Sequence, residues 1–214
     1  MTPARAGVDV RQPTVLPGGR LLAIRTAGRT TVAAAALLLV AACGEKAIDW
    51  NAPENFVLRE KSSKVDDKVK LEYVSLVDAT AKSVYDALAD VEHFPDFIPG
   101  VDNVQLLSVS GDTKTVQIAQ RVIGRQSNAK VEWTFHPDQL RIEFKTLVSN
   151  LSNNDGTYEI TASPDGKRCI VHSTFLVAEP AGSAAPIGVL AAGTREAFLA
   201  AARGVKARAT GAKK

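Results

Sequence analysis

The 214-residue chain has few cysteines, few histidines and few aromatic residues, and each shortage excludes some classes of protein. Two cysteines, Cys43 and Cys169, are too few for a disulfide framework. The three histidines, His93, His136 and His172, share no His-x-His or His-x-x-x-His spacing and have no acidic pair beside them. The sequence also lacks a Gly-x-Ser-x-Gly motif, a glycine-rich phosphate loop and a Cys-x-x-Cys motif. We therefore expect no metal, no cofactor and no catalytic residue.

A long hydrophobic run is lacking as well. The apolar run from Val32 to Ala42 is shorter than the roughly 20 residues that a membrane-spanning helix needs, and five arginines precede it. This order is typical of a secretory signal. The following residues, Val-Ala-Ala-Cys ending at Cys43, resemble a bacterial lipobox, which implies cleavage before Cys43 and a diacylglycerol on its thiol. We predict a lipoprotein signal peptide over residues 1–42; the alternatives are a plain signal peptide with an incidental cysteine, or a buried helix.

An excess of one charge is lacking once this segment is set aside. The whole chain has 26 basic and 23 acidic residues and a net charge of +3. Residues 1–42 hold five arginines and one aspartate, so the remainder has 21 basic against 22 acidic side chains. A near-neutral domain has no general basic surface for phosphates, and we expect no nucleic-acid partner.

The part of the chain after Cys43 begins with polar residues and then shows regular patterns. Residues 43–67 are charged and polar and are predicted to form a tether. Alternation from Val69 to Tyr73 predicts a strand. Residues 78–91 combine capping residues with apolar residues at helical spacing, which predicts a helix of about three turns. Pro95 and Pro99 break the segment that follows.

Six further strand-like segments arrive at hairpin spacing, with Gly, Pro, Asp and Ser between them. They cover residues 101–110, 113–123, 128–135, 140–148, 156–162 and 167–178. Apolar residues alternate with charged ones in the middle segments, so one sheet face is apolar and has to be covered. Residues 187–209 form an apolar stripe among many small residues, which predicts a long covering helix. The expected fold is α+β: a curved seven-stranded antiparallel sheet that grips a C-terminal helix, with a basic tail over residues 210–214.

The segment from Val77 to Val101, VDATAKSVYDALADVEHFPDFIPGV, is similar to the opening motif of the START-like (SRPBCC) superfamily. The similarity is to the branch of polyketide cyclase/dehydrase, lipid-transport and coenzyme-Q-binding proteins. It implies the helix-grip fold for a domain over residues 68–209. It also implies a deep pocket between the sheet and the long helix, with the turn at residues 93–100 at its mouth. The expected ligand is a lipid, a quinone or a polyketide-like molecule.

The turn, the apolar sheet face and the long helix supply the residues that we expect to line this pocket. Alternation with Val116 and Ile118 points Gln120 inward, and Tyr158 shares the inner face with Ile160. For each apolar residue predicted to bind the ligand, the alternative is an ordinary packing role in the hydrophobic core. The predicted ligand-binding residues are Phe94, Phe97, Ile98, Gln120, Trp133, Phe135, Phe144, Tyr158, Leu190 and Phe198.

The sequence therefore predicts a non-catalytic binding or carrier protein for a hydrophobic molecule. Lipidated Cys43 would hold it at a membrane, on the extracytoplasmic side of a bacterial cell envelope. One alternative is a cyclase or dehydratase acting on an aromatic or polyketide substrate, with Gln120 and Tyr158 as the polar groups of its pocket. Another is a structural envelope lipoprotein that binds a protein partner, for which a solid core is expected.

Overall fold

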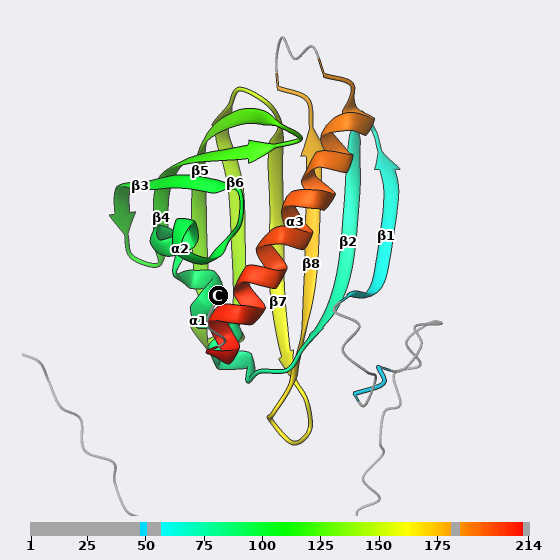
Figure 1. Cartoon of the computed structure of the whole chain (residues 1–214), viewed down its shortest axis with the longest axis vertical. Helices are drawn as coiled ribbons and strands as arrows, with labels where there is room; N and C mark the ends of the chain where they lie inside the picture. The colour runs from blue at the N-terminus through cyan, green and yellow to red at the C-terminus, as the bar shows by residue number, and fades with distance from the viewer. Residues whose placement is uncertain (1–47, 51–56, 181–184, 212–214) are drawn as a thin grey trace, which may run out of the picture. The chain divides into compact units, whose positions relative to one another are not determined.

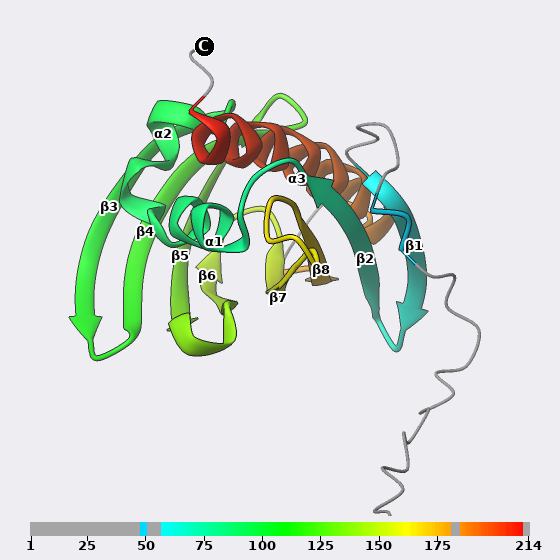
Figure 2. The same cartoon turned by 90° about the horizontal axis from the view of Figure 1, so that it is seen from below.

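A computed structural model describes residues 48–50, 57–180 and 185–211. Within these residues eight strands form one antiparallel sheet in the order β1-β2-β8-β7-β6-β5-β4-β3, and the sheet curves around helix α3 (Figures 1 and 2). The strands are β1 (Val57–Val65), β2 (Lys68–Val77), β3 (Val101–Ser110), β4 (Thr113–Val122), β5 (Arg125–His136), β6 (Arg141–Ser149), β7 (Asn153–Ala162) and β8 (Cys169–Ala178). The helices are α1 (Ala81–Ala89), η1 (Val91–His93), α2 (Phe94–Phe97), η2 (Pro137–Gln139) and α3 (Ile187–Thr210).

The predicted broken helix is confirmed, and its ends have local causes. The Thr80 hydroxyl caps α1 by accepting a hydrogen bond from the Ser83 backbone amide at 3.2 Å. The chain leaves helical geometry at Asp90, and α2 restarts with Pro95 in its first turn, where a missing amide proton costs nothing. The long helix α3 covers the predicted residues and ends at Gly211, which takes the left-handed conformation that glycine adopts readily.

The prediction of seven strands is wrong, because β1 lies inside the segment predicted as a tether. This strand has the sequence VLREKSSKV and lacks regular apolar alternation. It forms the edge of the sheet and pairs with β2 from Val57 to Val65, so backbone hydrogen bonds hold it without a buried face. Charged residues on an edge strand also oppose pairing with another chain. Arg195 of α3 adds two hydrogen bonds to Glu60, at 2.7 and 3.1 Å.

Strand β8 is buried along its concave face and is also covered at one end of its convex face. On the convex face, Ile170 packs with Val74 and Leu76 of β2, and Ile48 and Trp50 pack against this cluster. The backbone carbonyl of Trp50 also accepts a hydrogen bond from Arg168 at 2.8 Å. Residues 48–50 thus contact the domain, which further shortens the segment predicted as a tether.

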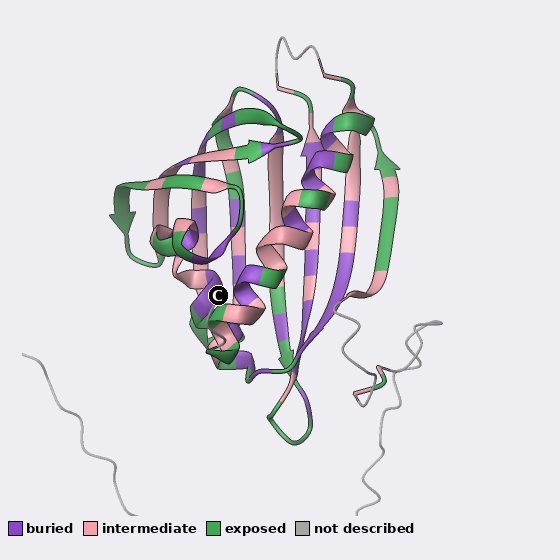
Figure 3. Ribbon diagram, viewed as in Figure 1, coloured by how far each residue is buried: buried purple, intermediate pink, exposed green. Residues whose placement is uncertain are grey.

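The main core fills the concave side, between the central strands, α1 and α3. Figure 3 shows the buried residues on these elements, whereas the edge strands β1 and β3 are largely exposed or half-buried. Cys169 is fully buried, and burial raises the pKa of its thiol to about 12. The predicted signal peptide and Cys43 lie outside the described residues. Among the described helices, none combines the length and the hydropathy of a membrane span.

Candidate ligand cavity

A cavity of about 270 Å³ lies between the concave sheet face and α3. Its volume is close to the lower end of the range for small-molecule sites, about 300–1,000 Å³. The sheet contributes Ile118, Val131, Trp133 and Phe144 from β4, β5 and β6. The opening is bounded by the Pro99–Gly100 turn, the end of β4 and the middle of α3. We call this space the main cavity.

Two glycines determine how closely α3 approaches its neighbours. A Cβ atom on Gly204 would lie 2.2 Å from the carbonyl oxygen of Phe97, so the helix backbone there touches α2 directly. A Cβ on Gly193 would lie 2.5 Å from the side chain of Ile123, at the β4–β5 turn. Between these contacts the cavity side of the helix carries small residues, among them Ala197 and Ala200. Small side chains between two close contacts leave the space that the cavity occupies.

A continuous series of aromatic rings crosses the main cavity. Phe94 of α2 meets Trp133 edge-on at 5.8 Å between ring centroids, and Trp133 lies 5.1 Å from Phe144. Phe144 contacts Tyr158 at 5.6 Å. On the far side, Phe198 of α3 lines the cavity and stacks on Tyr73, with 4.1 Å between the ring centroids. Tyr73 itself does not line the cavity. Such walls suit flat or chain-like apolar molecules, because rings offer a large contact area in a fixed geometry.

The main cavity also has polar groups, which lie on β6, β7 and α3. Asn154 connects them: its side-chain oxygen accepts a hydrogen bond from Thr194, its amide donates to Ser152, and its backbone bonds with Thr146. The pKa of Tyr158 is raised by burial, so its hydroxyl stays protonated and can donate a hydrogen bond. The charged lining residues, Arg121 and Glu196, are both exposed.

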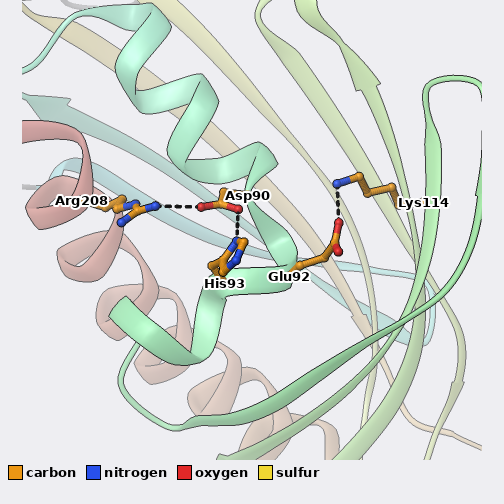
Figure 4. Close-up of polar contacts among 5 residues, drawn as sticks. All are labelled: Asp90, Glu92, His93, Lys114 and Arg208. Carbon is orange, nitrogen blue, oxygen red and sulfur yellow. Dashed lines mark hydrogen bonds and ion pairs between the residues drawn. The ribbon is translucent and has the colours of Figure 1, made fainter.

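The α1–α2 junction, which precedes the Pro99–Gly100 turn, is fastened on two sides by ion pairs, drawn in Figure 4. Asp90 accepts hydrogen bonds from His93 at 2.5 Å and from Arg208, near the end of α3, at 3.1 Å. Lys114 of β4 donates to Glu92 at 2.7 Å. The hydrogen bond that His93 donates to Asp90 raises the pKa of His93. These contacts hold the α1–α2 junction against both α3 and the sheet.

The structure brings most of the predicted ligand-binding residues together around the main cavity and places three of them elsewhere. Phe97 packs beneath α3, with the Arg208 guanidinium 5.6 Å from its ring centre. Phe135 is half-buried and lies under the Lys114 ammonium, and Leu190 is buried in the core. The residues that line the cavity are Phe94, Ile98, Gln120, Trp133, Phe144, Tyr158 and Phe198.

The sequence did not single out the polar group around Asn154 as part of the site. Strand β7 begins at Asn153 and not at Gly156, so the inward alternation of Gly156, Tyr158 and Ile160 extends back to Asn154. Extending that alternation by two residues was the available signal. Thr194 was visible in the helical stripe of α3, but its position next to Asn154 depends on how the helix crosses the sheet.

Comparison with known proteins agrees with this architecture. A family model described as polyketide cyclase/dehydrase and lipid transport matches residues 77–203, and the chain therefore belongs to this START-like family. The Zhui aromatase/cyclase from Streptomyces sp. R1128 is 20% identical, with a TM-score of 0.62 over 67% of this chain and 94% of that one. A START superfamily protein from Mycobacterium smegmatis is 15% identical, with a TM-score of 0.56 over 67% and 99% of the two chains. At these identities the two structures show the shared fold. The sequence matches none of the curated proteins with which it was compared.

Proposed function

We propose that this protein binds or carries a hydrophobic molecule in the main cavity. The observation that carries the proposal is the space of about 270 Å³ between aromatic rings of the sheet and small residues of α3. An apolar ligand needs no specific polar partner, since each buried CH₂ group contributes about 0.8 kcal/mol. Membership of a family of cyclase/dehydrase and lipid-transport proteins supports a ligand of this class.

The chemistry of the cavity favours binding over catalysis. General acid–base catalysis needs a group whose pKa lies near the working pH. Among the described lining residues, Arg121 and Glu196 are exposed, and burial moves the pKa of Tyr158 away from neutrality. The relative named as an aromatase/cyclase has the same fold, but at 20% identity it does not assign cyclase chemistry to these residues.

The proposal is tested by filling the main cavity from α3. Ala197 lines it and is half-buried, whereas Ala192 lies on the same helix and is exposed. We expect Ala197→Phe to weaken binding of the neutral fluorescent probe N-phenyl-1-naphthylamine by at least about tenfold, since the ring takes up ligand space. The matched variant Ala192→Phe should bind the probe like the unmodified chain. Fluorescence titration measures both affinities, and equal affinities in the two variants would contradict the proposal.

We further propose that a lipid on Cys43 holds the domain on the extracytoplasmic side of a bacterial envelope. The lipobox-like sequence supports this, and the packing of Ile48 and Trp50 leaves only a short connection. A chain from Cys43 to Ile48 spans at most about 18 Å, so the anchored domain would lie close to the membrane surface.

The anchor is tested by Cys43→Ser. We expect this variant to move from the membrane fraction to the soluble fraction of lysed cells, because its side chain has no thiol to carry the diacylglycerol. Cys169→Ser is the matched control, since Cys169 is buried in β8. Retention of the Cys43→Ser variant in the membrane fraction would remove the claim.

A further inference from the structure

A second, smaller space lies beside the main cavity, toward α1. Its volume is about 50 Å³, and we call it the inner cavity. This exceeds the roughly 10–15 Å³ that one water molecule requires, so a small chemical group fits there. The two spaces are neighbours, because they share Phe94, Ile98, Tyr158, Phe198 and Ala201 in their walls.

Two buried serines are among the residues that line the inner cavity. Ser75 of β2 is 3% exposed and Ser173 of β8 is 1% exposed, and both line this space. Neither hydroxyl has a hydrogen-bond partner among the residues that the structure describes. A buried polar group without a partner is unfavourable, which is why nearly all such groups in proteins are paired. Packing alone gives no reason for serine here, since Val77 and Val171 line the same space with apolar side chains.

The sheet register places a tyrosine on each side of Ser173. It lies opposite Tyr73 on β2 and opposite Tyr158 on β7, in one row across the concave face. The Tyr73 hydroxyl is buried and also has no partner within the described part of the chain. Tyr158 keeps accessible surface although it lies deep in the domain, because it lines both cavities. Tyr158 is thus the neighbour of Ser173 that lines both spaces, whereas Tyr73 lines neither of them.

The lining of the inner cavity suits an uncharged group. Among the described residues that line the inner cavity, none is ionised at neutral pH. Burial of a carboxylate or an ammonium without a partner of opposite charge is far more costly than burial of a neutral polar group. A hydroxyl or carbonyl oxygen, in contrast, can accept from one serine and stay neutral.

We propose that the inner cavity holds the uncharged, oxygen-bearing end of the ligand, while its apolar body occupies the main cavity. Ser75 and Ser173 hydrogen-bond this end and so set the direction in which the ligand enters. The preferred ligand is an amphiphile with a terminal hydroxyl or carbonyl group, and an ionised fatty acid is disfavoured. This inference rests on the proposed function, since it presumes that the main cavity takes an apolar ligand.

The test uses three octyl compounds of similar length: 1-octanol, 1-chlorooctane and octanoate. Each is titrated against the purified chain carrying N-phenyl-1-naphthylamine, and displacement of the probe gives its affinity. Ser75→Ala and Ser173→Ala are each expected to lower the affinity for octanol by about 2- to 10-fold, which corresponds to the loss of one neutral hydrogen bond. The affinity for chlorooctane should stay unchanged in both. Octanoate should bind the unmodified chain more weakly than octanol at neutral pH.

Matched variants separate this result from general damage. Ser108→Ala changes an exposed serine on β3 and should leave all three affinities unchanged. Ser127→Ala changes a buried serine that lines only the main cavity. The affinity for octanol, but not for chlorooctane, could fall in Ser127→Ala and stay unchanged in the two inner-cavity variants. The polar end of the ligand would then lie in the main cavity, and the proposal would be overturned. Thermal unfolding shows whether each variant is folded. If Ser173→Ala is not folded, the comparison is made with Ser75→Ala alone.

The remaining outcomes distinguish a failure of the role given to the serines from a failure of the proposed function of the main cavity. If octanol binds, but both inner-cavity variants weaken octanol and chlorooctane equally or leave both unchanged, the main-cavity function stands and the role of the serines is overturned. Tighter binding of octanoate than of octanol overturns the requirement for an uncharged end. If neither the probe nor any octyl compound binds the unmodified chain, the proposed function itself fails, and this inference fails with it.

Discussion

The last turns of α3 pack tightly against its neighbours, whereas the middle of the same helix leaves a cavity. Near the C-terminal end, Gly204 lets the backbone touch α2. Arg208 binds Asp90 beside this contact, as Figure 4 shows. In the middle, Ala197 and Ala200 face open space. Small residues therefore have opposite effects along one helix. A missing side chain gives close packing where the backbones can meet, and empty volume where other contacts keep them apart.

The largest effect is expected from a truncation in the packed region. Phe97→Ala should lower the free energy of unfolding by about 3–5 kcal/mol, because a buried ring is removed beneath α3. Since Phe97 does not line the main cavity, the variant should keep its affinity for N-phenyl-1-naphthylamine once folded. Urea unfolding followed by circular dichroism measures the stability. The matched variant Phe135→Ala, at a half-buried position, should lose clearly less; equal losses would erase the distinction between the two regions.

A smaller effect is expected from adding one methyl group to each of the two glycines that contact neighbours. Gly204→Ala should lower the free energy of unfolding by about 1–3 kcal/mol, because its Cβ would meet the Phe97 carbonyl and a backbone cannot turn aside. Gly193→Ala should lower the free energy of unfolding clearly less. Its Cβ would meet side-chain atoms of Ile123 at 2.5 and 2.6 Å and of Val122 at 2.9 Å; side chains shift more easily than a backbone carbonyl, and alanine favours the helix.

The same urea titration checks the glycine pair. If Gly193→Ala destabilises the domain as much as Gly204→Ala does, Ile123 is held as rigidly as the α2 backbone. The contact at the middle of α3 would then be as tight as the contact at its end.

The smallest effect is expected from pH, at the ion pairs beside the packed end. The hydrogen bond to Asp90 raises the pKa of His93 above its usual 6.5, and Asp96 acts in the same direction, while Arg208 opposes it. A raised folded-state pKa means that protonated His93 stabilises the fold. The contribution is present in full below the unfolded-state pKa and is lost as the pH rises through the folded-state pKa.

Unfolding midpoints from about pH 5.5 to pH 8.5, which span the usual titration range of histidine, measure this term. The unfolding midpoint of the unmodified chain should exceed that of His93→Gln most at the acid end of this range. The difference between the two midpoints should shrink as the pH rises. Asp90→Asn removes the partner of His93 and should show the same loss of pH dependence. A gap that widens toward alkaline pH would reverse the assigned sign.

Much of the fold could be predicted because its causes are local. Alternation in β5 and β6 depends on which face of a strand meets the core, and it identified Trp133 and Phe144 correctly as inward. The restart of the helix at α2 agrees with Pro95, which fits the first turn of a helix, and the extent of α3 follows from its apolar stripe. Strand β1 was missed for the opposite reason. An edge strand is held by backbone hydrogen bonds to β2, and these leave no pattern in the side chains.

By itself the sequence determined the order of the main helices and of seven of the eight strands, the apolar sheet face and the family resemblance, all of which depend on neighbouring residues. Only the tertiary structure decided which rings meet the cavity. Phe94 and Phe97 lie in the same short turn, yet the crossing of α3 leaves Phe94 in the wall and buries Phe97 beneath the helix. The tertiary structure likewise brought Ser75 and Ser173 into one small space. Their strands are distant in the chain, and only sheet pairing sets what lies opposite each hydroxyl.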